Sequence, residues 1–257
     1  RRARRVDLFE EREDVDREMA DDRDRFDCTG LPDRVLRDTD TVGLAVRQLV
    51  RQYDAAAFTF NFQSFTADAG VSTVPFLEAS KAMSRGLGYA GERDFLTAAF
   101  VAAILQGFGD ATFTEMFCPD WENDAIFMSH MGECNPDLAA GDVKLVEKEY
   151  VFGDVSNPAV PVFSIQPGPA TLANIAPGPD DTFSIIAAPV DVLDRGPADG
   201  FPDVPHYWVR PQNTDLKQFL RGYSEYGGTH HLALVLGDRM AALQQLAHML
   251  QLPFQRV

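Results

Sequence analysis

The chain has 257 residues, of which 45% are hydrophobic and 24% charged, and its formal net charge is −16. This is the composition of a globular protein with a sizeable core, in one large domain or two small ones. The negative charge disfavours nucleic acid and anionic membrane surfaces as partners, because both carry charge of the same sign.

The cysteine content and the apolar runs indicate the cellular compartment. The three cysteines, Cys28, Cys118 and Cys134, form no CxxC pair, which disfavours a zinc ribbon and a disulfide framework. The longest apolar run, residues 95–105, is too short to cross a bilayer, and no secretory leader is recognisable. We therefore expect a cytoplasmic protein. Because the chain opens on Arg1 without an initiator methionine, we expect its natural N-terminus to lie upstream.

The first segment, residues 1–27, is dense in charges of both signs, with extremes at 10–14 and 21–25. Such runs are typical of a solvated helix with many ion pairs, or of a partly disordered arm. We expect no specific interaction role for this segment.

Beyond Asp38, helical patterns alternate with an aromatic run. The run AAAFTFNF at 55–62 predicts a buried strand. Strand, helix, loop and helix in this order are typical of an α/β layer. Apolar spacing predicts helices over 42–50, capped by Thr39 or Asp40, over 76–83, ending at Gly86, and over 94–105, with Asp94 in the first turn.

From about residue 110 the chain changes to short β-like runs separated by turn residues. These runs predict a barrel or sandwich, with a long exposed loop at 194–204 and a final helix at 239–250. We place a boundary near residue 108, so that the expected units are 1–108 and 109–257. The predicted strands lie in ATFTEMF, DAIFMSHM, VKLVEKEYVF, VPVFSIQPG, ATLANI, TFSIIAAPV, HYWVR and LALVL.

The five histidines offer few candidates for a metal site. His130 ends an apolar strand in SHMGE. His230 and His231 follow two glycines that permit close backbone approach, in the turn GGTHH. His206 begins a strand and His248 lies in the final amphipathic helix. A lone histidine is more often structural than a ligand, so the pair His230 and His231 is favoured over the other three.

Three glutamates are candidates for the same chemistry. Glu92 lies between a glycine-rich turn and a helix start. Glu115 lies in an otherwise apolar strand, where a carboxylate is costly unless it is paired or binds a metal; strand alternation equally allows it to face solvent. Glu133 follows His130 by three residues and fits either a ligand or a partner that orients the imidazole.

Five stretches, GYAGERDFLTAA, ATFTEMF, MSHMGECNP, IQPGPAT and GGTHHLAL, resemble the L-arabinose isomerase and L-fucose isomerase group. Their order and approximate spacing agree from residue 58 to the final helix. The resemblance implies an incomplete Rossmann-like α/β layer followed by an antiparallel β-barrel with a terminal helix. It also implies a divalent metal, usually Mn²⁺ with Mg²⁺ or Co²⁺ as alternatives, held by Glu92, Glu115, His130 and His231.

The activity implied by this resemblance is metal-dependent aldose–ketose isomerisation of a small sugar. Glu92 and Glu115 are then the acid and base, and the reaction passes through an enediolate. His230 and Glu133 are expected near the sugar. Gln166 either reaches sugar hydroxyls or caps a turn. The family also implies a homo-oligomer, a trimer or a hexamer.

The chain departs from the family pattern beside both glutamates. The family commonly has Gly-Glu-Gly-Asp where this chain has Gly91-Glu92-Arg93-Asp94, and Glu-Asp-Tyr where it has Glu115-Met116-Phe117. Family members also carry an N-terminal domain upstream of this region. Alternative functions are therefore an impaired or non-catalytic sugar-binding relative, and a sugar epimerase or lyase that uses the same metal site. A hydrolase is disfavoured, because neither GxSxG nor HExxH occurs.

Overall fold

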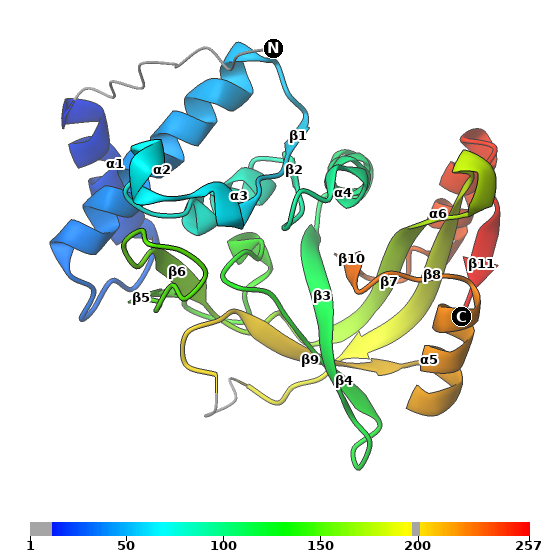
Figure 1. Cartoon of the computed structure of the whole chain (residues 1–257). Coiled ribbons are helices and arrows are strands. Elements are labelled where there is room, and N and C mark those ends of the chain that lie inside the picture. Colours follow the sequence, from blue (N-terminus) through cyan, green and yellow to red (C-terminus); the bar gives the residue numbers. More distant parts are fainter. Residues whose placement is uncertain (1–11, 197–200) are drawn as a thin grey trace.

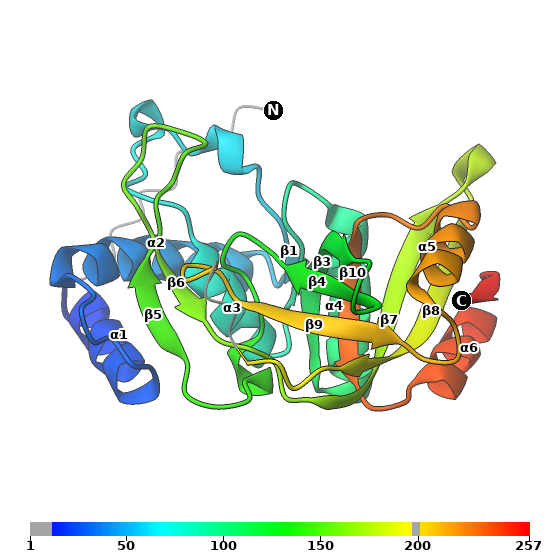
Figure 2. The ribbon, with the colours of Figure 1, turned by 90° about the horizontal axis from the view of Figure 1, so that it is seen from below.

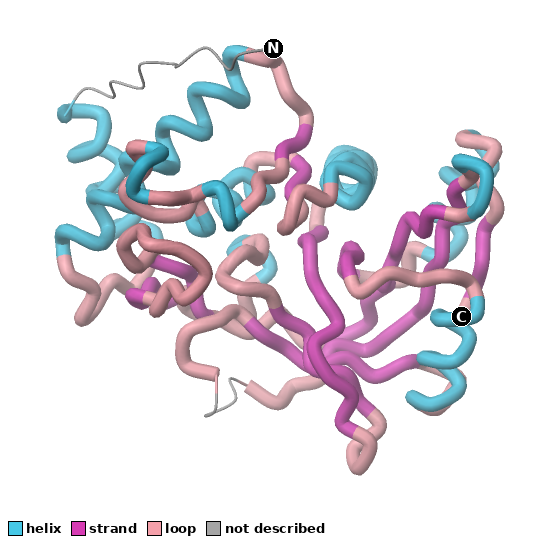
Figure 3. Tube along the Cα trace, viewed as in Figure 1, coloured by secondary structure: helices cyan, strands magenta, loops and turns pink. Residues whose placement is uncertain are grey.

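The computed structural model describes residues 12–196 and 201–257. Helices α1 to α3 and the short β5–β6 hairpin gather on one side, and a β-barrel with α5 and α6 lies on the other (Figures 1 and 2). Helix α4 lies between the two groups (Figures 1 and 3). In the described residues, no helix is both long and apolar enough to span a membrane.

The first half of the chain forms a helical layer with a two-stranded parallel sheet, which confirms the predicted α/β character. Strands β1 (Ala57–Phe58) and β2 (Gly88–Tyr89) pair in parallel. The helices are α1 (Arg12–Arg25), α2 (Asp33–Gln52), α3 (Phe76–Ser84) and α4 (Phe95–Phe108), with the 3₁₀ turns η1 (Phe62–Ser64) and η2 (Ala67–Ala69) between them.

The second half is an antiparallel barrel followed by a helix, as predicted. Six strands follow one another in the order β8-β7-β10-β3-β4-β9, and pairing of β8 with β9 closes the ring. The barrel strands are β3 (Ala111–Asp120), β4 (Ala125–Ser129), β7 (Gly168–Pro177), β8 (Phe183–Val192), β9 (His206–Pro211) and β10 (His231–Leu236).

The remaining elements of this half lie around the barrel. Helix α6 (Met240–Met249) leads into β11 (Phe254–Arg256), which pairs in parallel with the outer edge of β8. The others are η3 (Pro136–Leu138), β5 (Lys144–Glu147), β6 (Ala159–Val162), η4 (Pro179–Asp181) and α5 (Leu216–Glu225).

Alternation along the strands divides the core into two parts. On β10, Leu232 and Leu234 belong to one cluster, which also contains buried residues of α5. The intervening Ala233 and Val235 belong to a second cluster, which contains the buried faces of α4 and α6. Because successive strand side chains point to opposite faces, His231 lies on the α4 side of the barrel with Ala233.

Three expectations about the elements need correction. Thr39 and Asp40 do not cap a helix, because α2 begins earlier, at Asp33, and both side chains are buried within it. The strand predicted at 55–62 as buried is limited to Ala57–Phe58, and both residues are only half-buried. Helix α5 was not predicted, although Asp215 caps it and Leu216, Phe219 and Tyr223 form its buried face.

In the charged segment, residues 12–25 form α1, and residues 1–11 lie outside the described part.

A buried ionic network joins α1, α2 and α3. Lys81 Nζ lies 2.6 Å from Glu18 Oε1, 2.7 Å from Asp22 Oδ2 and 3.7 Å from Asp40 Oδ1. Three carboxylates therefore share this one ammonium. Burial raises the pKa of Asp40 to about 8, because the attraction of Lys81 does not outweigh desolvation and the neighbouring Asp22.

The raised pKa of Asp40 predicts a pH-dependent loss of stability. An unfolded aspartate titrates near 4, so between about pH 4 and pH 8 only the folded chain retains this proton, and the free energy of unfolding falls as pH rises. We expect Asp40→Asn to remove this slope. Its stability relative to the wild type should increase up to about pH 8 and then level off.

Urea unfolding at a series of pH values measures this effect. Asp38→Asn, two residues earlier on α2 and only half-buried, is the matched control and should run parallel to the wild type. A constant difference between Asp40→Asn and the wild type across the pH range would contradict the prediction.

Candidate functional site

Three adjacent strands bring the first candidate residues to one end of the barrel. In the antiparallel register of β10 with β3, His231 lies directly opposite Glu115. Glu115 in turn lies opposite Ser129, the last residue of β4, and His130 follows it directly in the chain. Glu115 shares the face of Phe113, which belongs to the α4-side cluster. The alternation of β3 therefore directs Glu115 toward α4, where its side chain is 21% exposed.

Glu115, His130 and His231 form a compact group. One ligand atom from each lies within 4.8 Å of the others, and His130 Nε2 is 4.0 Å from Glu115 Oε2. Both imidazoles are buried. The ring of Phe113 packs edge-on against both, with centroids 4.7 Å from His130 and 5.1 Å from His231. This aromatic contact limits the rotation of the two rings.

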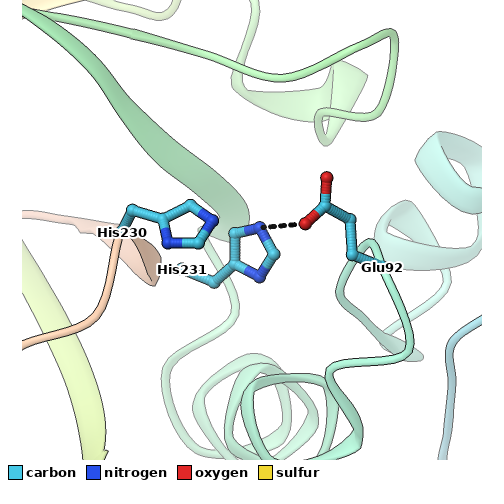
Figure 4. A group of neighbouring side chains, drawn as sticks. All are labelled: Glu92, His230 and His231. Atoms are coloured by element: carbon cyan, nitrogen blue, oxygen red, sulfur yellow. Dashed lines mark ion pairs between the residues drawn. The ribbon is translucent and has the colours of Figure 1, made fainter.

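Glu92 faces His231 from the side opposite His230, as Figure 4 shows. Its Oε2 is 4.0 Å from His231 Nε2, and with His230 and His231 it forms a second group of the same compactness. Glu92 and Arg93 have φ of +59° and +67°, a conformation that non-glycine residues rarely adopt. The carboxylate of Glu92 is directed toward the histidines, and backbone strain of this kind is typical of functional sites.

Gly91 allows the same loop to approach His130. A Cβ atom at this position would lie 2.6 Å from His130 Cε1. A side chain at position 91 would therefore displace the imidazole. This clash explains why the residue before Glu92 is a glycine.

Each buried histidine is held by a carboxylate through its second ring nitrogen. His130 Nδ1 is 2.7 Å from Glu133 Oε2, and His231 Nδ1 is 3.1 Å from Asp94 Oδ2. Because a carboxylate only accepts, these contacts place a proton on Nδ1 of both rings, and in the neutral ring Nε2 is then an acceptor that faces the group. Carboxylate–imidazole pairs of this kind commonly support metal-binding histidines.

The two supporting carboxylates are themselves fixed in different ways. Tyr89 donates a hydrogen bond of 2.6 Å to Glu133 Oε1. Asp94 is the N-cap of α4, where Oδ1 accepts the backbone N–H of Thr97 at 2.9 Å. The helix N-terminus therefore holds one oxygen of Asp94, and His231 takes the other.

The protonation states of the site follow from this arrangement. Burial would lower the pKa of His130, but the charge and hydrogen bond of Glu133 outweigh it and raise the pKa above its usual value. Burial raises the pKa of Glu115, against the attraction of the histidines. Burial would also raise the pKa of Asp94, but the hydrogen bonds from His231 and Thr97 lower it.

The residues present fit a divalent cation. In the described part of the chain, His231 Nε2 is a buried nitrogen without a hydrogen-bond partner, and such atoms are rare unless a ligand satisfies them. The surrounding donors are carboxylate oxygens and imidazole nitrogens, a mixture that suits Mn²⁺ and related ions.

A cavity of about 190 Å³ adjoins the group. Glu92, His130 and Glu133 supply its polar part, and aromatic rings supply most of the remaining wall. The aromatic residues are Phe60, Phe62, Phe76, Tyr89 and Phe152. The cavity thus offers an enclosed space beside the candidate ligands.

The structure brings most of the predicted residues together. Glu92, Glu115, His130 and His231 converge as two groups that share His231. His230 is largely exposed, with Nε2 3.6 Å from Glu115 Oε1. The side-chain amide of Gln166 donates to the carbonyl of Ala139 at 3.4 Å, which favours the alternative of a turn contact.

Two supporting residues were missed as parts of the site. Asp94 was recognised only as a helix-start acid, and its second role depends on a strand that lies 137 residues away in the sequence. Tyr89 gave no sequence signal, because its partner Glu133 is 44 residues distant.

Asp94→Asn separates the two roles of this residue. Asparagine caps helices as well as aspartate does, so α4 should remain intact, whereas His231 loses its charged partner. We expect a ten- to hundredfold weaker affinity for Mn²⁺, roughly the usual effect of removing such a partner, with little change in thermal stability.

Asp215→Asn is the matched control, since Asp215 caps α5 in the same way by accepting the N–H of Gln218 at 2.8 Å. Isothermal titration with Mn²⁺ should show wild-type affinity for this variant. Equal affinities for both variants would contradict the supporting role of Asp94.

Comparison with known proteins identifies the family. The model of the L-arabinose isomerase C-terminal domain matches residues 110–253, and the model of the L-arabinose isomerase central domain matches residues 5–107. The chain is 28% identical over 226 residues to L-arabinose isomerase of Saccharophagus degradans, which covers 84% of this chain and 43% of the relative. It is 29% identical over 213 residues to that of Leuconostoc mesenteroides, covering 80% and 43%. For the Escherichia coli K12 enzyme the identity is 26% over 220 residues, covering 81% and 42%. The chain thus spans less than half the length of these relatives, and it belongs to the L-arabinose isomerase family.

Proposed function

We propose that the protein is a metal-dependent aldose–ketose isomerase of the L-arabinose isomerase type. The observation that carries the proposal is the convergence of Glu115, His130 and His231, with Glu92 facing the same His231. Both buried histidines have Nδ1 engaged by a carboxylate, so their free nitrogens point into one space. This arrangement suits a cation that is bound by these side chains and by a substrate at the same time.

Glu92, Glu115, His130 and His231 are the proposed ligands, with Mn²⁺ as the favoured ion and Mg²⁺ or Co²⁺ as alternatives. When bound, the ion polarises the sugar carbonyl and stabilises negative charge on the neighbouring oxygens. The two glutamates approach His231 from different elements, Glu115 from β3 and Glu92 from the loop before α4.

Glu92 and Glu115 are also the proposed acid and base. Isomerisation moves a proton between C1 and C2 of the sugar, and one carboxylate removes it while the other serves the adjacent oxygen. Burial raises the pKa of Glu115 in the metal-free site, which favours a group that accepts and returns a proton. The product of the proton removal is an enediolate of the sugar.

The aromatic cavity is the proposed place for the sugar carbons. It opens onto Glu92 and His130, so that a sugar extending into it keeps one end at the candidate ligands. His230, exposed beside Glu115, and Glu133 are the proposed polar contacts, whereas Gln166 is retained only through the family resemblance.

The chain organisation is also a proposal. The two family models meet between residues 107 and 110, which supports units of 1–108 and 109–257.

We infer a homo-oligomer, a trimer or a hexamer, from the family. We also infer a reducing compartment such as the cytoplasm, because the chain has only three cysteines.

A panel of aldoses and ketoses, incubated with the protein and Mn²⁺, tests the function. Formation of the isomeric sugar supports the proposal. Formation of an epimer would favour an epimerase with the same site. Binding of Mn²⁺ and sugar without any product would favour the non-catalytic alternative.

Two substitutions test the assignment of the site. Glu115→Gln removes the proposed base while it keeps the side-chain shape, and His231→Ala removes the nitrogen that the two groups share. We expect each to lower turnover at least about a thousandfold, since general base and ligand roles together exceed either alone.

Exposed residues of the same types provide the controls. Glu122→Gln and His248→Ala lie on the surface of the β3–β4 hairpin and of α6, and both should retain wild-type turnover. Wild-type activity in Glu115→Gln or in His231→Ala would refute the assignment.

The route of the hydrogen is a separate prediction. In D₂O, a carboxylate base exchanges the abstracted proton with solvent before return, so we expect deuterium at C1 or C2 of the product. Mass spectrometry and NMR of the product measure this. A product free of deuterium would indicate a hydride shift between the two carbons.

A further inference from the structure

The buried carboxylate of Glu133 depends on very few partners. Its side chain is 1% exposed and lies beside the aromatic cavity. One oxygen contacts His130 Nδ1 at 2.7 Å, and the other accepts the Tyr89 hydroxyl at 2.6 Å. A buried ionised carboxylate that loses one of two hydrogen bonds is strongly destabilised.

Tyr89 is held firmly by its aromatic neighbours. It lies on β2, is 0% exposed, and its ring packs against Phe58, Phe60 and Phe113 with centroids 5.3, 5.4 and 5.7 Å away. Glu133 lies in the irregular segment after β4, where Ser80 Oγ donates to the carbonyl of Gly132 at 3.2 Å and accepts the N–H of Cys134 at 3.1 Å. The backbone of Glu133 is therefore anchored on both sides, and the hydroxyl of Tyr89 orients the carboxylate at the end of its side chain.

We propose that Tyr89 is a positioning residue for the metal site, acting through Glu133 to hold the His130 ring with Nε2 facing Glu115. Without the hydroxyl, the Glu133 carboxylate loses one of its two hydrogen-bond partners and is free to turn away, and His130 Nδ1–H then loses its anionic acceptor. The ring is then free to change its tautomer or to rotate. The inference rests on the proposed metal site and concerns the residue that orients one ligand.

Tyr89→Phe removes only the hydroxyl and keeps the aromatic packing. We expect about tenfold weaker Mn²⁺ binding, at the lower end of the effect of supporting residues, and a changed visible absorption spectrum of the Co²⁺-loaded protein. Tyr207→Phe is the matched control. Tyr207 is 2% exposed but belongs to the other core cluster, so its variant should retain the wild-type affinity and spectrum.

A double variant tests whether Tyr89 acts through Glu133. If it does, Tyr89→Phe combined with Glu133→Gln binds Mn²⁺ no more weakly than Glu133→Gln alone, since the two changes interrupt the same contact. If the double variant binds Mn²⁺ more weakly than Glu133→Gln by the full effect of Tyr89→Phe, Tyr89 acts by another route and the proposal is overturned.

A measurement without metal separates this inference from the proposed function. In the metal-free protein at alkaline pH, where imidazoles are neutral, long-range ¹H–¹⁵N NMR reports the tautomer of His130. The signals of His130 are assigned as those that are missing from the spectrum of His130→Gln. We expect Nδ1–H in the wild type and in Tyr207→Phe, and its loss or averaging in Tyr89→Phe and in Glu133→Gln.

The outcomes are distinct. A wild type without Mn²⁺ affinity would refute the metal site, while the NMR result would still decide the positioning role. Tyr89→Phe with an unchanged His130 tautomer, or with wild-type Mn²⁺ affinity and Co²⁺ spectrum, would overturn the role of Tyr89.

Discussion

The site depends on the register of three antiparallel strands. Pairing of β10 with β3 places His231 opposite Glu115, and pairing of β3 with β4 places Glu115 opposite Ser129, directly before His130. A shift by one residue on any of these strands would reverse the faces of its side chains. The apolar residues of the same strands prevent such a shift, because Leu232 and Leu234 face one core cluster and Ala233 and Val235 the other. The hydrophobic core therefore determines the position of the polar site.

The polar residues around the histidines are held in different ways. Asp94 is fixed by the N-terminus of α4, and Tyr89 by three aromatic rings. Asp94 contacts His231 directly, whereas Tyr89 acts on His130 through Glu133. Glu92 lies in a loop with positive φ, and its side chain is 47% exposed. The two histidines are thus supported from buried elements, and one candidate glutamate lies at the exposed edge of the site.

Charge burial serves two different purposes in this fold. Around Lys81 the acids outnumber the bases, so Asp40 has a pKa of about 8 and is a cost to stability at neutral pH. Around His130 and His231, the carboxylates of Glu133 and Asp94 each face an imidazole. The first network joins three helices, and the second orients two imidazole rings. Each leaves buried polar atoms without a hydrogen-bond partner among the described residues, namely the two carboxylate oxygens of Asp40 in the first and His231 Nε2 in the second.

The sequence by itself determined the order of the elements and the residue types of the site. Periodicity located α3, α4 and the barrel strands, because local spacing reflects which face is buried. The family resemblance then indicated Glu92, Glu115, His130 and His231, and the structure brings them together as two groups. Only the tertiary structure decided which partners hold them. Asp94 meets His231, and Tyr89 meets Glu133, through contacts between residues 137 and 44 positions apart. It also decided that Glu115 faces α4 rather than solvent, since alternation defines two faces of a strand but only packing decides which face is covered.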